Sequence, residues 1–215
     1  NNMDNNWKIE TKMIQGGFEP KNGEPRVLPI YQSTTYKYDS TDHVAKLFDL
    51  AVPGHMYSRI SNPTVEALEN KMAALEGGVG ALCTSSGQSA SMVAILNVCD
   101  AGDHFIAMNT IYGGTYNLFA VTLKKMGVEV SFVDADASKE EITNLIKDNT
   151  KAIFGETLSN PALKVLDIEK FAEIAHKNGI PLILDNTFPS PFLCRPFEHG
   201  ADIVIHSTTK YLDGH

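Results

Sequence analysis

The sequence predicts an α/β fold, a mostly parallel β-sheet with helices on both faces. Short apolar runs alternate with amphipathic segments over residues 61–215, and this strand-helix alternation is typical of a parallel sheet. Polar residues follow several of the apolar runs, as expected at the carboxyl ends of such strands. The 215 residues are 43% hydrophobic and 20% charged, which suffices for a sizeable core in one domain or parts of two.

The first predicted helix of this region begins at Asn62-Pro63, an N-cap followed by a first-turn proline. Apolar residues recur at helical spacing after it until Gly77 ends the helix: Val65, Leu68, Met72 and Leu75. Residues 81–84 are then predicted to form a buried strand. A second helix opens at 85–88 and continues through Val98.

The rest of the chain repeats this alternation without any repeat in its sequence. Strands are predicted at 104–108, 128–133, 151–156, 180–184 and 202–206. A helix starts at 112–115 and stops at Gly127, and Ser138 with Glu141 forms a capping box at the start of another. The last helix ends at Gly179 and is marked by Ile168, Phe171, Ile174 and Ala175.

Residues 1–60 differ in composition from residues 61–215, which hold the predicted sheet. They are rich in glycine and proline and contain one helix candidate, around 43–48. We interpret residues 1–60 as an extended arm that contacts a neighbouring subunit. A loose surface segment is the alternative.

Composition also excludes several classes of function. The net charge of −8, without a basic run, argues against nucleic acid as a partner. No apolar run is long enough to span a bilayer, and the N-terminus lacks a signal peptide. The three cysteines, Cys83, Cys99 and Cys194, have no paired spacing and are expected to be reduced core thiols in a cytoplasmic protein. The seven histidines show no metal-ligand spacing, so we expect no metal.

Two reactive side chains stand at the ends of neighbouring predicted strands. Asp185 closes the run 180–184, and Lys210 follows the next strand. A buried carboxylate beside the ring nitrogen of pyridoxal phosphate keeps that nitrogen protonated, and lysine forms a Schiff base with the aldehyde. Each residue alone is more often a turn residue or a solvated lysine. Their order makes the pair a candidate site for this cofactor.

Two further features fit the same ligand. Ser86, Gly87 and Gln88 open a helix after a predicted strand, where backbone amides and the helix dipole favour a phosphate. Tyr112 follows another strand, where its ring can stack on a flat cofactor. The alternatives are an ordinary capped helix start and a rim tyrosine. Gly78-Val79-Gly80 is not a dinucleotide loop, because Cys83 replaces the third glycine and the segment precedes a strand.

Six motifs together resemble the cysteine/methionine-metabolism family of pyridoxal phosphate enzymes. They are Tyr57-Ser58-Arg59, Ser86-Gly87-Gln88, Tyr112-Gly113-Gly114-Thr115, Asn160-Pro161, Asp185-Asn186-Thr187 and Ser207-Thr208-Thr209-Lys210. The resemblance implies that 61–215 is the cofactor-binding large domain, similar to that of aspartate aminotransferase. It also implies that the C-terminal part is missing, including an arginine for the substrate carboxylate, and that these 215 residues alone are inactive.

The resemblance assigns a role to each matched position. Lys210 becomes the Schiff-base lysine and proton shuttle, Asp185 the partner of the ring nitrogen, and Tyr112 the stacking ring. Tyr57 or Tyr112 assists proton transfer. The remaining cofactor contacts are Ser86, Gly87, Gln88, Asn160, Thr187, Ser207 and Thr209, with Tyr57 and Arg59 reaching the phosphate in an adjacent subunit. Glu156 is expected to be only structural.

The reaction implied is γ-replacement on O-acetylhomoserine, in which sulfide or a thiol displaces acetate to give homocysteine or methionine. The partners implied are the amino-acid substrate, sulfide, the remainder of the sequence, and further copies in a tetramer of dimers with shared sites. Cystathionine synthesis and methionine γ-elimination remain alternatives, although γ-lyases of the family often carry cysteine where Gly114 stands. A truncated segment that only binds cofactor or a partner chain is the non-enzyme alternative.

Overall fold

The computed structural model describes residues 6–214 and divides the chain into two compact units. Unit 1 is Asn1–Cys83 and unit 2 is Thr84–His215. Among the described residues, no helix is both long and apolar enough to cross a membrane.

Unit 1 contains three helices and long irregular segments. They are α1 (Ile9–Gln15), α2 (Thr41–Phe48) and α3 (Pro63–Glu76). The expected N-cap and C-cap of α3 are confirmed, since the Asn62 side chain accepts from the backbone of Thr64 and Gly77 has a left-handed backbone. The helix α1 was not predicted, because it is short and buries none of its residues, so its sequence lacks an apolar stripe.

The glycine- and proline-rich segment before α3 is tied to the start of that helix. Asn62 is buried, and its Nδ2 donates to the carbonyl of Tyr31 at 2.9 Å and to Oγ of Ser58 at 3.0 Å. Gly17 lies against α3, where a Cβ atom would stand 2.2 Å from the carbonyl oxygen of Ala67. Gly17 and Tyr31, which are far from α3 in the sequence, are therefore held against this helix and its N-cap.

The strand predicted at residues 81–84 is wrong. This segment pairs with no strand among residues 6–214, and Leu82 is 72% exposed. The backbone N–H of Cys83 instead donates to Oε1 of Glu69, at 2.8 Å. The apolar run resembles a buried strand locally, but β-structure also needs a neighbouring strand that supplies hydrogen bonds.

The three cysteines were expected to be core thiols. None of them is in a disulfide, but only Cys99 is buried, whereas Cys83 and Cys194 are half-buried.

Unit 2 has the alternating pattern that the sequence predicts. Its order is α4 (Gly87–Val98), β1 (His104–Met108), α5 (Gly113–Asn117), the π-helix η1 (Leu118–Leu123), β2 (Glu129–Val133), α6 (Lys139–Asn144), β3 (Thr150–Glu156), α7 (Ile168–Lys177), β4 (Leu182–Asp185), α8 (Ser190–Leu193), the 3-10 helix η2 (Pro196–His199) and β5 (Ile203–Ile205). The capping box of Ser138 and Glu141 at α6 is also confirmed.

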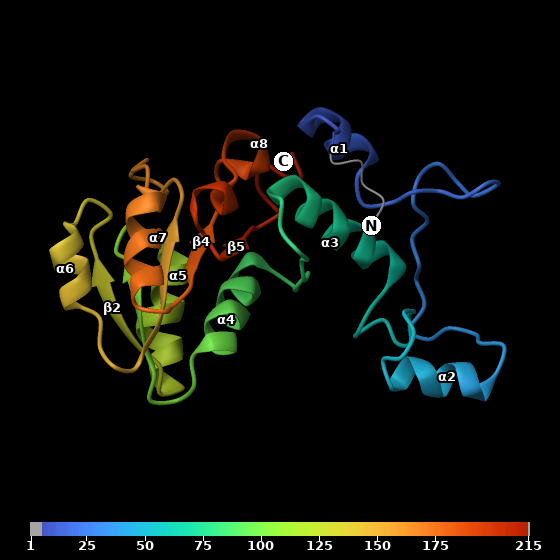
Figure 1. Ribbon diagram of the computed structural model, residues 1–215, viewed down its shortest axis with the longest axis horizontal. Coiled ribbons are helices and arrows are strands. Elements are labelled where there is room, and N and C mark those ends of the chain that lie inside the picture. The colour runs from blue at the N-terminus through green and yellow to red at the C-terminus, as the bar shows by residue number, and fades with distance from the viewer. Residues whose placement is uncertain (1–5, 215) are drawn as a thin grey trace. The chain divides into compact units, whose positions relative to one another are not determined.

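The five strands form one parallel sheet in the order β2-β1-β3-β4-β5. The chain runs from β1 outward to β2 and then returns past β1 to β3. Because such crossovers are right-handed, α5 and η1 cover one face, and α6 and α7 cover the other. The contacts agree, since α4 packs on α5 and α7 packs on α6 (Figure 1). Helices on both faces are therefore confirmed.

The core of unit 2 is built around Phe119 of η1. Its ring packs edge-on against Phe105 of β1, with centroids 4.9 Å apart, and against Phe154 of β3, at 4.8 Å. All three rings are fully buried. This aromatic cluster fixes η1 on the two strands whose carboxyl ends border the pocket described below.

We predict that Phe119→Ala lowers the free energy of unfolding by about 3–5 kcal/mol, because it leaves a cavity between β1 and β3. Urea unfolding followed by circular dichroism measures this loss. Val121→Ala is the control, since Val121 lies in the same π-helix but is 49% exposed. Equal effects of the two substitutions would contradict the central place of Phe119.

Candidate functional site

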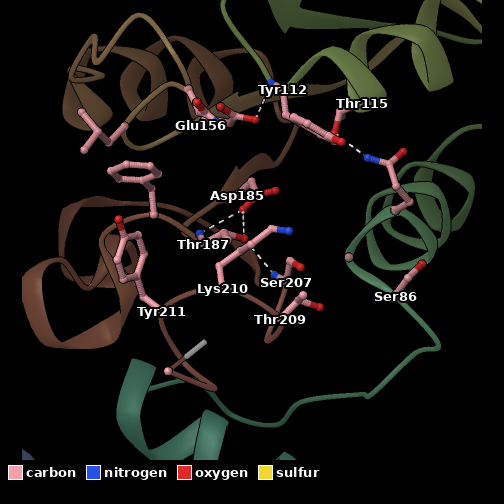
Figure 2. Close-up of a pocket in the computed structure, with 16 residues that line it drawn as sticks. Ser86, Tyr112, Thr115, Glu156, Asp185, Thr187, Ser207, Thr209, Lys210 and Tyr211 are labelled. Atoms are coloured by element: carbon pink, nitrogen blue, oxygen red, sulfur yellow. Dashed lines mark hydrogen bonds between the residues drawn. The ribbon is translucent and has the colours of Figure 1, made fainter.

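A pocket of about 680 Å³ lies in unit 2 at the carboxyl ends of the strands. The segments after β1, β3, β4 and β5 line it together with the start of α4 (Figure 2). Its lining includes Ser86, Gly87, Gln88, Tyr112, Asn160, Asp185, Thr187, Ser207, Thr209 and Lys210. The structure thus brings ten of the predicted site residues together.

Asp185 ends β4 and is joined to the loop after β5 by a chain of hydrogen bonds. Its Oδ1 accepts from the backbone N–H of Thr187 at 2.9 Å and from the hydroxyl of Thr187 at 2.5 Å. The same hydroxyl oxygen accepts from the backbone N–H of Ser207 at 2.8 Å. Burial raises the pKa of the Asp185 carboxyl. The hydrogen bonds from Thr187 and the charge of His206 act in the opposite direction and lower this pKa.

The start of α4 and the loop after β5 approach each other closely. A Cβ atom on Gly87 would lie 2.7 Å from Cβ of Ser207, so only glycine fits here. The hydroxyl of Ser86 accepts from the backbone N–H of Ser89, at 3.0 Å. The first amides of a helix have no acceptor within it, so those of Gly87 and Gln88 are suited to bind an anion. Ser207 and Thr209 add hydroxyl groups to the same pocket.

Lys210 extends into this pocket from the turn after β5. Figure 2 shows its amine between Asp185 and the side chains of Ser207 and Thr209. The exposed side chain of Lys210 is therefore open to a ligand. An amine, a carboxylate and an anion-binding helix start then surround one space.

Tyr112 lies opposite, as the N-cap residue of α5, and is 52% exposed. Its ring lies over Gly114, where a Cβ atom would be 2.6 Å from Cε1 of the ring. Gln88 Nε2 donates to Oγ1 of Thr115 at 3.0 Å, which connects α4 to α5. The Tyr112 ring therefore forms one wall of the space that Lys210 enters (Figure 2).

Glu156, which was expected to be only structural, also lines the pocket. Its Oε1 accepts from the backbone N–H of Tyr112 at 2.6 Å. Burial raises the pKa of its carboxyl to about 7, and the charge of Asp185 adds to this, whereas hydrogen bonds from the backbone of Tyr112 and Asn160 oppose it. Glu156 and Asp185 are register partners at the ends of β3 and β4.

Other pocket residues were missed by sequence reasoning: Thr115, Leu158, Phe188, Tyr211 and Gly214. Phe188 and Tyr211 form an edge-on ring pair with centroids 5.3 Å apart. They directly follow the Asp185-Asn186-Thr187 motif and Lys210, and that adjacency was the available signal.

Tyr57 and Arg59 are the predicted site residues that the pocket does not include. Both are exposed residues of unit 1, and the Arg59 guanidinium lies 5.6 Å from the ring centroid of Tyr57. Tyr57 also pairs with Thr35 in an isolated β-bridge. Their expected contact with a phosphate in a neighbouring subunit stays a prediction.

The pocket residues fit pyridoxal phosphate. Asp185 provides a carboxylate for the ring nitrogen, Lys210 an amine for the aldehyde, and Tyr112 a ring for stacking. The close approach of Gly87 and Ser207 forms a cradle for the phosphate. Among residues 6–214, no group of three histidine, cysteine, aspartate or glutamate side chains is placed to hold a metal ion.

Curated relatives match almost the whole chain. It is 49% identical over 214 residues to O-acetyl-L-homoserine sulfhydrylase from Leptospira meyeri, covering 99% of this chain and 48% of that protein. It is 45% identical over 209 residues to homocysteine synthase from Schizosaccharomyces pombe, covering 96% and 48%. The chain thus spans about half the length of these relatives.

Two solved structures have the same fold. A putative O-acetylhomoserine (thiol)-lyase from Campylobacter jejuni, which contains N'-pyridoxyl-lysine-5'-monophosphate, superposes with a TM-score of 0.94 at 40% identity, covering 98% of this chain and 52% of that one. Cystathionine gamma-lyase from Lactobacillus plantarum, complexed with L-serine, superposes with a TM-score of 0.88 at 35% identity, covering 97% and 52%.

The family model described as Cys/Met metabolism PLP-dependent enzyme, where PLP is pyridoxal phosphate, matches residues 10–215. This match covers nearly the whole chain and agrees with the fold and with the residues that line the pocket. The chain therefore belongs to the family of Cys/Met metabolism PLP-dependent enzymes.

Proposed function

We propose that the chain forms the pyridoxal phosphate-binding part of an enzyme that replaces the γ-substituent of O-acetyl-L-homoserine. After a proton is removed from the α-carbon, the bond from the γ-carbon to the acetate oxygen breaks and acetate leaves. Sulfide then adds to the γ-carbon, and homocysteine is formed. The observation that carries the proposal is one pocket that holds Lys210, Asp185, Tyr112 and the Gly87-Ser207 cradle. Relatives named for this activity, at 44–49% identity, support the choice of reaction.

Lys210 and Asp185 carry the chemistry in this proposal. When bound, pyridoxal phosphate withdraws electrons from the α-carbon of an attached amino acid. The amine of Lys210 would hold the cofactor through its aldehyde, and as a free amine it would move protons at the α-carbon of the substrate. The carboxylate of Asp185, oriented by Thr187, keeps the ring nitrogen protonated.

The remaining pocket residues bind and orient. The amides of Gly87 and Gln88, with the hydroxyls of Ser86, Ser207 and Thr209, bind the phosphate. Tyr112 would stack on the ring, and Asn160 would lie near the phenolic oxygen of the cofactor and the substrate carboxylate. Thr187 contributes through its bonds to Asp185 and Ser207.

The alternatives within the family are cystathionine synthesis and γ-elimination. The glycine at position 114 favours replacement over elimination, since γ-lyases of the family often carry cysteine there. Product analysis with sulfide, with cysteine and without an acceptor distinguishes the three reactions. Homocysteine formed only with sulfide supports the proposal, and 2-oxobutanoate without an acceptor points to elimination. A segment that does not bind pyridoxal phosphate will lack visible absorption.

We also propose that the active form is an oligomer with shared sites, built from dimers into a tetramer. Tyr57 and Arg59 support this because they lie side by side and exposed in a glycine- and proline-rich segment. Arginine is suited to forked contact with phosphate. The cytoplasmic location expected from the cysteine pattern stays a prediction.

We predict that Lys210→Ala abolishes the borohydride-stable attachment of pyridoxal phosphate and nearly all turnover, because no other lysine lines the pocket in residues 6–214. Peptide mass spectrometry after borohydride reduction locates the attachment. Lys177→Ala is the control, since Lys177 lies on α7 outside the pocket and pairs with Glu173. A cofactor still reduced onto the Lys210→Ala variant would overturn the assignment.

We predict that Asp185→Asn folds and retains the hydrogen bonds to Thr187 but loses more than about tenfold in kcat, equivalent to about 1.4 kcal/mol. An amide does not stabilise a protonated ring nitrogen as a carboxylate does. Steady-state kinetics measure the loss, with Asp148→Asn, an exposed position outside the pocket, as control. A kcat within about tenfold of the parent would make Asp185 a turn residue only.

We predict that mixing inactive Arg59→Ala subunits with inactive Lys210→Ala subunits restores activity. A mixed dimer contains one site in which both residues are intact, if Arg59 serves the site of its neighbour. Activity is measured after subunit exchange, and the exchange itself is followed by mass spectrometry. Complete exchange without recovered activity would rule out shared sites.

A further inference from the structure

We propose that Glu156 is a positioning residue for Tyr112. Its carboxylate holds the backbone of Tyr112, so that the aromatic ring stays against Gly114 at the pocket wall. The consequence for cofactor binding rests on the proposed function, whereas the hold on Tyr112 does not. No role for Glu156 beyond a structural one follows from the sequence motifs.

The hydrogen bond has the geometry of a helix cap supplied from another element. Tyr112 is the N-cap residue of α5, and no side chain of α5 caps this helix. In a capping box, the glutamate at the third helical position accepts from the backbone N–H of the N-cap residue, as Glu141 does for Ser138 at α6. At α5 the third position is Thr115, and Glu156 of β3 takes the N–H of Tyr112 instead, at 2.6 Å.

Apart from Thr115, which accepts from Gln88, the start of α5 has no side chain of its own that fixes it among the described residues. Its first two residues are Gly113 and Gly114, which carry no side chains and have low helix propensity. The Tyr112 ring occupies the space above Gly114. A Cβ atom added to Gly114 would lie 2.6 Å from Cε1 and 3.2 Å from Cζ of this ring. The backbone bond to Glu156 and this contact together determine where the ring lies.

Placing an ionisable carboxyl at position 156 costs free energy, which argues against a merely structural role for Glu156. It stands in register with Asp185, and burial together with that neighbouring charge opposes its ionisation. The titratable groups around it are Asp185 from β4, Tyr112 from the segment after β1, and Lys210 from the turn after β5, while His206 acts on Asp185. A neutral acceptor would avoid the repulsion, but an ionised one holds the N–H more strongly.

The titration of Glu156 has a defined effect on stability. The pKa rises from 4.5 to about 7 in the folded protein, so the folded state binds the extra proton between these values. The stability that this proton provides is complete below about pH 4.5 and is lost as pH rises through about 7. Glu156→Gln should therefore raise Tm relative to the parent by more at pH 8 than at pH 5.

The direct test is nuclear magnetic resonance of protein labelled with 15N at its seven tyrosines, first without added cofactor. Tyr112→Phe identifies the Tyr112 signal. We expect the Tyr112 amide proton to move downfield as pH rises through about 7, because the bond to an ionised carboxylate is stronger. The amide of Tyr116, which donates to the carbonyl of Tyr112 at 2.9 Å within the helix, is the internal reference.

In Glu156→Gln the Tyr112 amide shift should stay constant with pH, since the acceptor no longer titrates. Glu140→Gln is the control, because Glu140 is an exposed residue of α6, and its Tyr112 shift should titrate as in the parent. A Tyr112 shift that does not titrate in the parent, or that titrates unchanged in Glu156→Gln, overturns the proposal. Fluorescence titration with pyridoxal phosphate then tests the consequence. Glu156→Ala and Gly114→Ala should raise Kd by about tenfold, and Glu156→Gln by less than about threefold.

Equal Kd values for Glu156→Ala and the parent would also overturn the positioning role. If the parent binds no pyridoxal phosphate, the proposed function fails, and the amide titration still decides whether Glu156 holds Tyr112. Because glutamine is close in shape to glutamate, Glu156→Gln keeps the test valid even if the alanine variant does not fold.

Discussion

The site depends on the parallel pairing of β1, β3, β4 and β5. Because these strands run in the same direction, their carboxyl ends meet at one edge of the sheet, and the segments that follow them form one pocket. The chain leaves β1 toward β2 and leaves β3 toward β4. This reversal between β1 and β3 opens the crevice in which ligands of open α/β sheets bind. The arrangement explains why residues as distant as Gly87 and Lys210 line one pocket.

Register adds a finer constraint than strand order. The pairing of β3 with β4 places Glu156 beside Asp185, so two carboxylates share the edge of the pocket. The two carboxylates have different hydrogen-bond partners. Asp185 accepts from Thr187, which in turn accepts from Ser207, whereas Glu156 accepts from the backbone of Tyr112. In the proposed function, one carboxylate faces the cofactor ring, and the other positions the tyrosine that we propose stacks on this ring.

Much of unit 2 could be predicted because its signals are local. The apolar run of β1 and the capping box at Ser138 each define an element within a few residues, and in unit 1 the cap at Asn62 does the same for α3. Residues 81–84 were misread because a strand requires a partner that the local pattern does not reveal. Glu156 was undervalued for the same reason, since its bond to Tyr112 spans 44 residues of sequence. Tyr57 and Arg59 lie in unit 1, outside the pocket, so unit 2 does not test the role expected for them.

The glycines of the motifs show how the site constrains the sequence. Gly87 is required because the start of α4 meets Ser207 with no space for a Cβ atom, and Gly114 because the ring of Tyr112 occupies that space. Neither glycine has a left-handed backbone, so turn geometry does not explain them. Their cause is close approach, in one case of two backbone segments and in the other of a ring and a helix. The neighbour of Gly87 is far away in the sequence, whereas the neighbour of Gly114 is only two residues away and is itself held by Glu156 from another strand.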